Sequence, residues 1–158
     1  MRFSALRGAA LAVLALLFTA GGVLGAAAPA SAHSIGQVVV SAEGCDWPNG
    51  NYSVLHSGPI ETNDGDRFGT AYLLWNAQYQ QNCAVALKTG SLHGVVSWTA
   101  ASLQIEGRPS AIDMDYYAHY AAASAEAADR CVRYQALIET PNLDRTAYGG
   151  RNTWGNCG

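Results

Sequence analysis

The sequence contains four histidines, whose imidazole side chains are suited to binding a metal. Cleavage of the chain just before the first of them would give it a free amino group. His33 directly follows Ala30-Ser31-Ala32, a small-residue pattern typical of leader cleavage. If the chain is cut there, the amine and imidazole of His33 can together hold copper as a histidine brace. The second imidazole would come from one of the other histidines: His56, His93 or His119.

Copper is nevertheless the less favoured interpretation of these histidines. Such a site would resemble that of the exported copper monooxygenases that cut polysaccharides. The chain after Ala32 is short for those enzymes, however, and the motifs expected after His33 are missing. A histidine at the start of a chain more often belongs to a frayed terminus. We therefore expect no metal and no cofactor, with a copper enzyme using His33 as the minor alternative.

The other candidates for catalysis are weak. Asp113 and Asp115 are two residues apart in an expected strand, whereas the carboxylates of glycosidases flank the scissile bond and normally come from different strands. Asn63–Asp66 has calcium-binding residue types but is better explained as a turn. Ser91 and His93 lie too close in sequence to bond easily, and they do not form a Gly-x-Ser-x-Gly motif. No catalytic residue is assigned, and we expect the protein not to be an enzyme.

Residues 1–32 have the three parts of a secretory signal peptide. Arg2 and Arg7 give a charged start, Leu11–Phe18 is a short apolar run, and small residues lead to Ala32. The apolar run is too short to span a bilayer. We expect cleavage after Ala32, secretion, no membrane association afterwards, and a single β-domain over residues 33–158.

The expected exported part is acidic. Loss of Arg2 and Arg7 leaves seven basic and twelve acidic residues, a net charge of −5. Nucleic-acid binding relies on clustered Lys and Arg, and no such cluster occurs after residue 32. Nucleic acid is therefore excluded as an expected partner.

The four cysteines, Cys45, Cys83, Cys131 and Cys157, predict two disulfides. An even number of cysteines in a small exported domain is typical of a disulfide framework. Three pairings are possible, and we favour Cys45–Cys83 with Cys131–Cys157 because nearer partners close more easily. This pairing would hold the C-terminus, one residue beyond Cys157, to the body of the domain.

Alternation of apolar and polar residues indicates β-strands. Residues 132–138 show it, and so do residues 112–118, where Ile112, Met114 and Tyr116 are expected to face inward. Sequences rich in Gly, Pro, Asn and Asp separate these runs as turns. The sequence therefore predicts an all-β fold, either an antiparallel β-sandwich or a barrel. One helical turn is compatible with this prediction.

Two segments are harder to assign. Residues 38–41, "VVVS", are interpreted as an opening strand. Residues 120–130 are rich in alanine, which favours a helix by propensity, but they have no apolar stripe that separates helix from strand. Both conformations stay open for that stretch.

Three segments resemble the actinobacterial secreted proteins called the spore-associated protein A family. They are "TAYLLWNAQYQQNCAVALKTG" (70–90), "DYYAHYAAASAEAADRCVRY" (115–134) and "YGGRNTWGNCG" (148–158). The chain departs from the family after the third cysteine, where residues 132–147 replace a Trp-Gly-Gly segment. The resemblance implies a non-catalytic secreted protein associated with components of the spore or cell-envelope surface. A module that binds cell-wall polysaccharide is the alternative.

Overall fold

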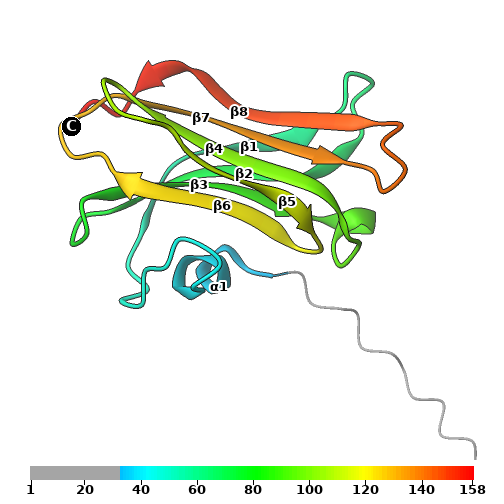
Figure 1. Ribbon diagram of the computed structural model, residues 1–158, viewed down its shortest axis with the longest axis horizontal. Helices are drawn as coiled ribbons and strands as arrows, with labels where there is room; N and C mark the ends of the chain where they lie inside the picture. The colour runs from blue at the N-terminus through cyan, green and yellow to red at the C-terminus, as the bar shows by residue number, and fades with distance from the viewer. Residues whose placement is uncertain (1–32) are drawn as a thin grey trace, which may run out of the picture.

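The computed structural model describes residues 33–158, which form one antiparallel sheet curled into a nearly closed barrel (Figure 1). The predicted leader, residues 1–32, lies outside the described residues. A short helix and a 3₁₀ turn accompany the eight strands. In chain order the elements are α1 (Ile35–Val40), β1 (Ser53–Glu61), β2 (Arg67–Asn76), β3 (Gln81–Lys88), η1 (Gly90–Leu92), β4 (Ser97–Ile105), β5 (Ala111–Tyr117), β6 (Tyr120–Glu126), β7 (Val132–Glu139) and β8 (Thr146–Gly155).

The strands follow the order β5-β4-β7-β8-β1-β2-β3-β6, and all neighbours are antiparallel. β5 and β6 are therefore the two edges of the sheet, yet they are consecutive in the chain and lie against each other. Asp113 of β5 joins them, because its Oδ2 accepts a hydrogen bond from the backbone N–H of Ala122 in β6, at 2.8 Å. The predicted all-β fold is confirmed.

The alternation in β4 and β7 sets the interior of the barrel. Alternate residues of β4 from Ser97 to Ile105 are buried, and so are those of β7 from Val132 to Ile138. Leu103 pairs with Tyr134 across the two strands, and both are fully buried. Cross-strand packing of this kind stabilises a sheet, so the period-two prediction for residues 132–138 is confirmed.

The prediction for the faces of β5 is wrong. Ile112, Met114 and Tyr116 are about half exposed, while Asp113 and Tyr117 point toward the seam between the two edges. The hydroxyl of Tyr117 donates to Oδ1 of Asp113 at 2.5 Å. The Asp113 carboxylate thus accepts hydrogen bonds at the seam, where β5 and β6 are not paired by a regular backbone ladder. For this reason a polar residue occupies the inner side of this edge strand.

The prediction of a strand at residues 38–41 is also wrong, because α1 covers Ile35–Val40. Ser34 is its N-cap: the Ser34 hydroxyl accepts from the Gln37 N–H, and the Gln37 side chain accepts from the Ser34 N–H. This reciprocal capping box is a sequence signal for a helix start. It outweighs the β-propensity of the three consecutive valines.

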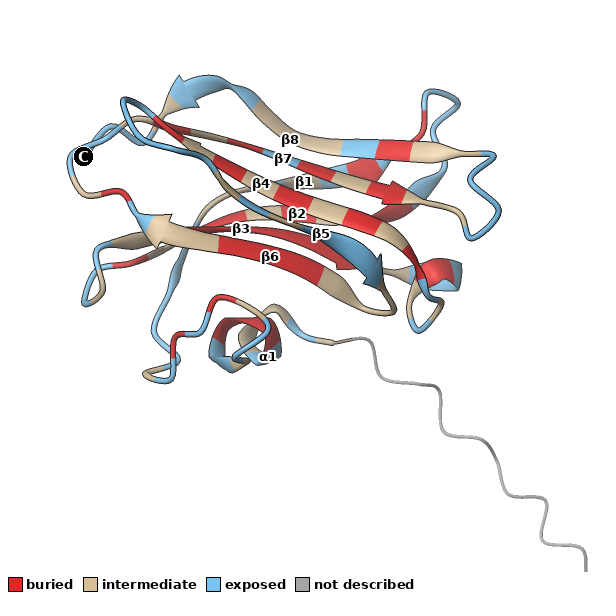
Figure 2. Cartoon of the chain, in the orientation of Figure 1, coloured by how far each residue is buried: buried red, intermediate tan, exposed pale blue. Residues whose placement is uncertain are grey.

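α1 covers the outer face of β2, β3 and β6 (Figure 2). Val38, Val39 and Trp47 pack there, fully buried or nearly so, against Leu74 and Val85. Burial of each such side chain contributes about 1.5–3 kcal/mol. As a result β3 is buried on both faces, and the helix is held firmly although it has fewer than two turns.

Two disulfides fasten the ends of the domain, with the pairing that the sequence favours. Cys45–Cys83 joins the segment after α1 to β3. Cys131–Cys157 joins the residue before β7 to the C-terminal tail. The tail is thereby anchored one residue from its end.

The alanine-rich stretch is mainly a strand, since β6 runs from Tyr120 to Glu126. Its small side chains suit a crowded position: Ala121 lies in the interior core, and Ala122 faces the helix side. Within residues 33–158, none of the helices has the length and apolar character needed to cross a membrane.

Candidate metal centre

Three of the four histidines meet at one end of the barrel, although each comes from a different segment. His33 immediately precedes Ser34, the N-cap of α1. His93 directly follows η1 as its C-cap residue. His119 lies in the two-residue turn between β5 and β6. Closure of the barrel and packing of α1 on it bring these segments together.

The facing nitrogens of the three histidines are separated by distances suited to a shared metal. Nε2 of His93 lies 3.3 Å from Nδ1 of His33 and 3.3 Å from Nδ1 of His119. The three ligand atoms all lie within 4.8 Å of one another. Two nitrogens bound to one metal at about 2.0–2.1 Å are roughly 2.9 Å apart at a right angle and roughly 3.4 Å apart at the tetrahedral angle. The separations from His93 fall between these values.

The backbone nitrogen of His33 belongs to the same cluster. It lies 3.1 Å from Nε2 of His93, closer than either ring nitrogen. Nε2 of His93 therefore faces three nitrogens, but an imidazole nitrogen has either one lone pair or one proton. It cannot satisfy all three by hydrogen bonding, so hydrogen bonds alone leave this convergence unexplained.

Buried Lys88 holds together the segments that carry His93 and His119. Its Nζ donates to the carbonyl of Val95 at 2.7 Å, to Oγ of Ser97 at 2.7 Å and to the carbonyl of Tyr117 at 2.8 Å. Val95 is two residues after His93, and Tyr117 is two residues before His119. One ammonium group, which has three donors, thus fixes the backbone on both sides.

Backbone hydrogen bonds tie the same segments directly. The Lys88 N–H donates to the His119 carbonyl at 2.9 Å, and the Gly94 N–H donates to the Ala118 carbonyl at 2.9 Å. Gly94 has φ +81°, a conformation that glycine adopts without strain. The chain can therefore turn sharply directly after His93.

The surroundings of His93 and His119 favour their neutral forms. Burial lowers the pKa of His93, and the nearby His33 and Lys88 lower it further. Burial also lowers the pKa of His119, with added effects from His33, His93 and Lys88. A metal binds the neutral form of imidazole, so both shifts favour metal binding by His93 and His119.

Tyrosines line the opening of the cluster. A cavity of about 370 Å³ is bordered by His33, His119, Glu43 and three tyrosines, Tyr116, Tyr117 and Tyr120. The hydrogen bond to Asp113, together with burial and nearby acidic groups, raises the pKa of Tyr117 to about 12. Tyr117 therefore stays protonated and does not act as an anionic ligand at neutral pH.

His56 lies apart from this cluster. Its Nδ1 is 2.7 Å from the hydroxyl of Tyr134, so it has a structural partner inside the barrel. Of the three histidines weighed as partners for His33, the structure brings His93 and His119 to it and leaves His56 elsewhere.

The other sequence candidates have structural roles. Asp64 and Asp66 of the Asn63–Asp66 turn are paired with Arg145, at 2.9 and 2.5 Å, which occupies the carboxylates that calcium would need. Oδ1 of Asp115 accepts from the backbone N–H of Tyr116, and Asp113 seals the barrel seam. Ser91 lies in η1. Nε2 of the nearby His93 faces the other histidines.

Sequence reasoning missed Lys88. It stands at the end of the largely apolar segment "CAVALK" (83–88). A lysine that closes an apolar strand usually reaches solvent. Only the fold shows that Lys88 is fully buried and that three acceptors surround its ammonium.

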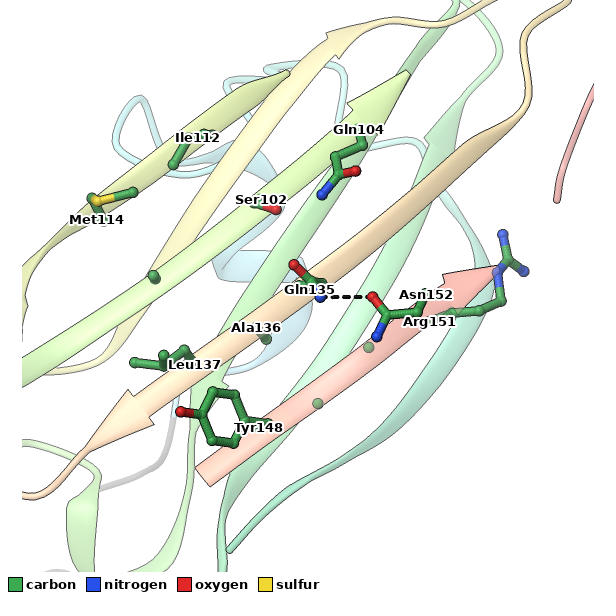
Figure 3. A pocket seen from close by; sticks show the side chains of 13 residues that line it. Ser102, Gln104, Ile112, Met114, Gln135, Ala136, Leu137, Tyr148, Arg151 and Asn152 are labelled. Atoms are coloured by element: carbon green, nitrogen blue, oxygen red, sulfur yellow. Dashed lines mark hydrogen bonds between the residues drawn. The ribbon is translucent and has the colours of Figure 1, made fainter. Parts of the chain in front are cut away.

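A separate groove of about 630 Å³ runs over the outer face of β5, β4, β7 and β8 (Figure 3). Ile112 and Met114 line one side of it, and Tyr148 lies on the other. Between them are amide side chains, of which Gln135 donates to Oδ1 of Asn152 at 2.6 Å. The lining, as the structure describes it, holds Arg151 but no acidic residue.

Comparison with known proteins found no match: no family model fits the chain, and no curated protein or solved structure is significantly similar to it. The resemblance to the spore-associated protein A family therefore stays a prediction. Function has to be argued from the histidine cluster and the groove themselves.

Proposed function

We propose that this protein is a secreted, non-catalytic copper-binding protein that uses His33, His93 and His119 as ligands. The observation that carries the proposal is the position of Nε2 of His93, which has three other nitrogens within 3.3 Å. A metal ion placed among the three imidazoles can bind a nitrogen of each, whereas the one lone pair on Nε2 of His93 cannot accept from every neighbouring nitrogen.

Copper is the metal that this set of ligands favours. All the converging atoms are nitrogens, and imidazole suits copper, zinc, nickel and iron. Among divalent ions the affinity of such a site is highest for Cu²⁺. The two disulfides indicate an oxidising, extracellular setting, where the cupric ion is the expected form.

Binding without catalysis is supported by what borders the site. Glu43 is the one acidic residue among the described residues that line the adjoining cavity, so the pair of carboxylates that glycoside hydrolysis uses is not present there. We infer that the site holds copper and does not use it. Peroxide formation from oxygen and a reductant, faster than with the same amount of free copper, would contradict this part of the proposal.

The proposal is tested by titrating protein that begins at His33 with Cu²⁺ in competition with a chromophoric chelator. We expect one ion bound tightly per chain. The ion should also raise the melting temperature, because a thousandfold excess of free copper over the dissociation constant stabilises the folded state by about 4 kcal/mol. Zn²⁺ under the same conditions should bind more weakly. Failure to retain copper after desalting would overturn the proposal.

A second candidate function is attachment to cell-wall polysaccharide, which would keep the protein at the spore or cell-envelope surface. The groove over β5, β4, β7 and β8 favours it. An exposed aromatic ring, Tyr148, can stack on a sugar, and the amides of Gln104, Gln135 and Asn152 can bond hydroxyl groups. This function does not compete with copper binding, since the two sites are lined by different residues.

Attachment is tested by co-sedimentation with insoluble peptidoglycan and chitin. Tyr148→Ala should lower the bound fraction about fivefold, the scale of one lost aromatic contact. Tyr52→Ala is the matched control, because Tyr52 is also exposed but lies outside the groove. Equal sedimentation of the two variants, or none by the unmodified protein, would remove the support for this candidate.

A further inference from the structure

We propose that the α-amine of His33, released when the leader is cut after Ala32, is the fourth nitrogen ligand of the copper site, so that export processing switches on tight binding. This inference rests on the proposed function. It adds a backbone ligand, the α-amine, to the three imidazoles. It also states when this ligand forms, namely when the leader is removed.

The first step is geometric. The backbone nitrogen of His33 lies 3.1 Å from Nε2 of His93, within the range expected for two ligands of one metal. The same residue presents Nδ1 at 3.3 Å from that atom. A metal held by the backbone nitrogen and Nδ1 closes a six-membered ring with Cα, Cβ and Cγ of His33. One residue therefore offers a chelate without any change in the chain path.

The second step is chemical. In the precursor this nitrogen is an amide, and its lone pair is delocalised into the carbonyl group. Hydrolysis by a peptidase breaks the bond between the Ala32 carbonyl carbon and the His33 nitrogen. Water supplies a hydroxyl group to the carbonyl carbon and a proton to the nitrogen, so a carboxylic acid and an amine result, and the acid then releases its proton to the solvent. The amine has a localised lone pair and can bind Cu²⁺.

The third step concerns the local scaffold, which holds His33 in place. Ser34 caps α1 through its capping box with Gln37, and Tyr120 donates from its hydroxyl to Oγ of Ser41 at 2.9 Å, fastening the other end of the helix to β6. His33 is therefore attached to an anchored helix, and its terminus does not fray freely. A fixed position is what a terminal ligand requires.

The fourth step is the consequence for copper. Cu²⁺ prefers a tetragonal set of nitrogen and oxygen ligands. Three imidazoles and one amine supply four nitrogens, and the separations of the other three from Nε2 of His93, 3.1, 3.3 and 3.3 Å, are nearer to a tetrahedral than to a planar set. Cu²⁺ binding is therefore expected to move one of these nitrogens away from Nε2 toward the opposite side of the ion. Four nitrogen ligands would leave no strong position for a substrate. The mature protein would hold copper firmly, while the precursor inside the cell would have the imidazoles alone.

The experiment uses semi-synthesis at the Gly44–Cys45 junction, where a peptide covering residues 33–44 can be ligated to residues 45–158 that begin with cysteine. Three versions are made and oxidatively refolded: a free α-amine, an Nα-acetyl group and an Nα-methyl group. The methyl version is the control, because it also adds a substituent to the nitrogen but keeps a basic amine. Equal melting temperatures without copper would show that all three fold alike.

We expect acetylation to weaken Cu²⁺ binding by about 100-fold or more, whereas methylation should change the affinity by less than about tenfold. The electron paramagnetic resonance spectrum should change from four nitrogen ligands to three on acetylation. If the acetylated and free proteins bind equally with the same spectrum, this inference falls and the proposed function stands. If none of the three versions binds copper, both fall.

Discussion

Replacement of His93 by alanine is expected to weaken Cu²⁺ binding more than any other single substitution in the cluster, by about 1,000-fold. Nε2 of His93 is the atom that both other imidazoles face, each at 3.3 Å. Its loss removes that ligand and leaves only His33 and His119, whose ring centroids are 4.3 Å apart. The measurement is the competition titration with purified protein that starts at His33.

His56→Ala is the control for this prediction. His56 also contacts an aromatic partner, the hydroxyl of Tyr134, so its loss should reduce stability modestly while leaving copper affinity unchanged. His119→Ala should weaken copper binding, but less than His93→Ala. If His93→Ala kept its affinity within about threefold, or His56→Ala lost as much, the three-histidine site would be refuted.

Replacement of Lys88 by methionine is expected to lower the free energy of unfolding by about 1–3 kcal/mol, the cost of leaving buried acceptors without their donor. Methionine fills a similar space but leaves the carbonyls of Val95 and Tyr117 without the donor they have now. Because these carbonyls lie two residues from His93 and His119, copper affinity should fall as well. Chemical denaturation and the copper titration measure the two effects.

Ser97→Ala is the graded control for Lys88, since it removes one of the three acceptors and should cost about 1 kcal/mol. The pH dependence gives a second readout. Burial lowers the pKa of Lys88 to about 8, below its value in an unfolded chain, so the unfolded state binds more protons between about pH 8 and 10. Over that range the unmodified protein should gain stability relative to Lys88→Met. Equal stability of the two proteins at all pH values would contradict the role of Lys88.

The sequence was sufficient where one physical effect dominates locally. The alternation of residues 132–138 predicts a strand with one buried face, and β7 has that face. The cysteines are few and well spaced in the chain, so loop closure favours the pairing that the structure contains. These predictions need no knowledge of how distant segments meet.

The sequence was misleading where a local signal competes with another or where the sheet ends. Three valines suggest a strand, yet the capping box of Ser34 and Gln37 and a buried outer face of the barrel make α1 a helix. In β5, apolar residues suggest an inward face, but an edge strand needs acceptors, and Asp113 supplies them at the seam.

The sequence favoured a protein without a metal, and a histidine site was only its minor alternative. The leader signal marks His33, but His93 is 60 residues away and His119 a further 26. Which histidine reaches His33 depends on closure of the barrel, on α1 packing against β3 and β6, and on the contacts of Lys88. Since these are long-range effects, His56 was as good a candidate as the other two until the fold placed it beside Tyr134.

The most direct test of the copper site is X-ray diffraction at the copper absorption edge, with crystals of the protein beginning at His33 grown with one equivalent of Cu²⁺. If the three histidines bind copper, a single anomalous peak should lie about 2.0–2.1 Å from Nδ1 of His33, Nε2 of His93 and Nδ1 of His119, and in contact with the α-amine. A peak elsewhere on the protein, with the three imidazoles bonded to water, would contradict copper binding by these histidines.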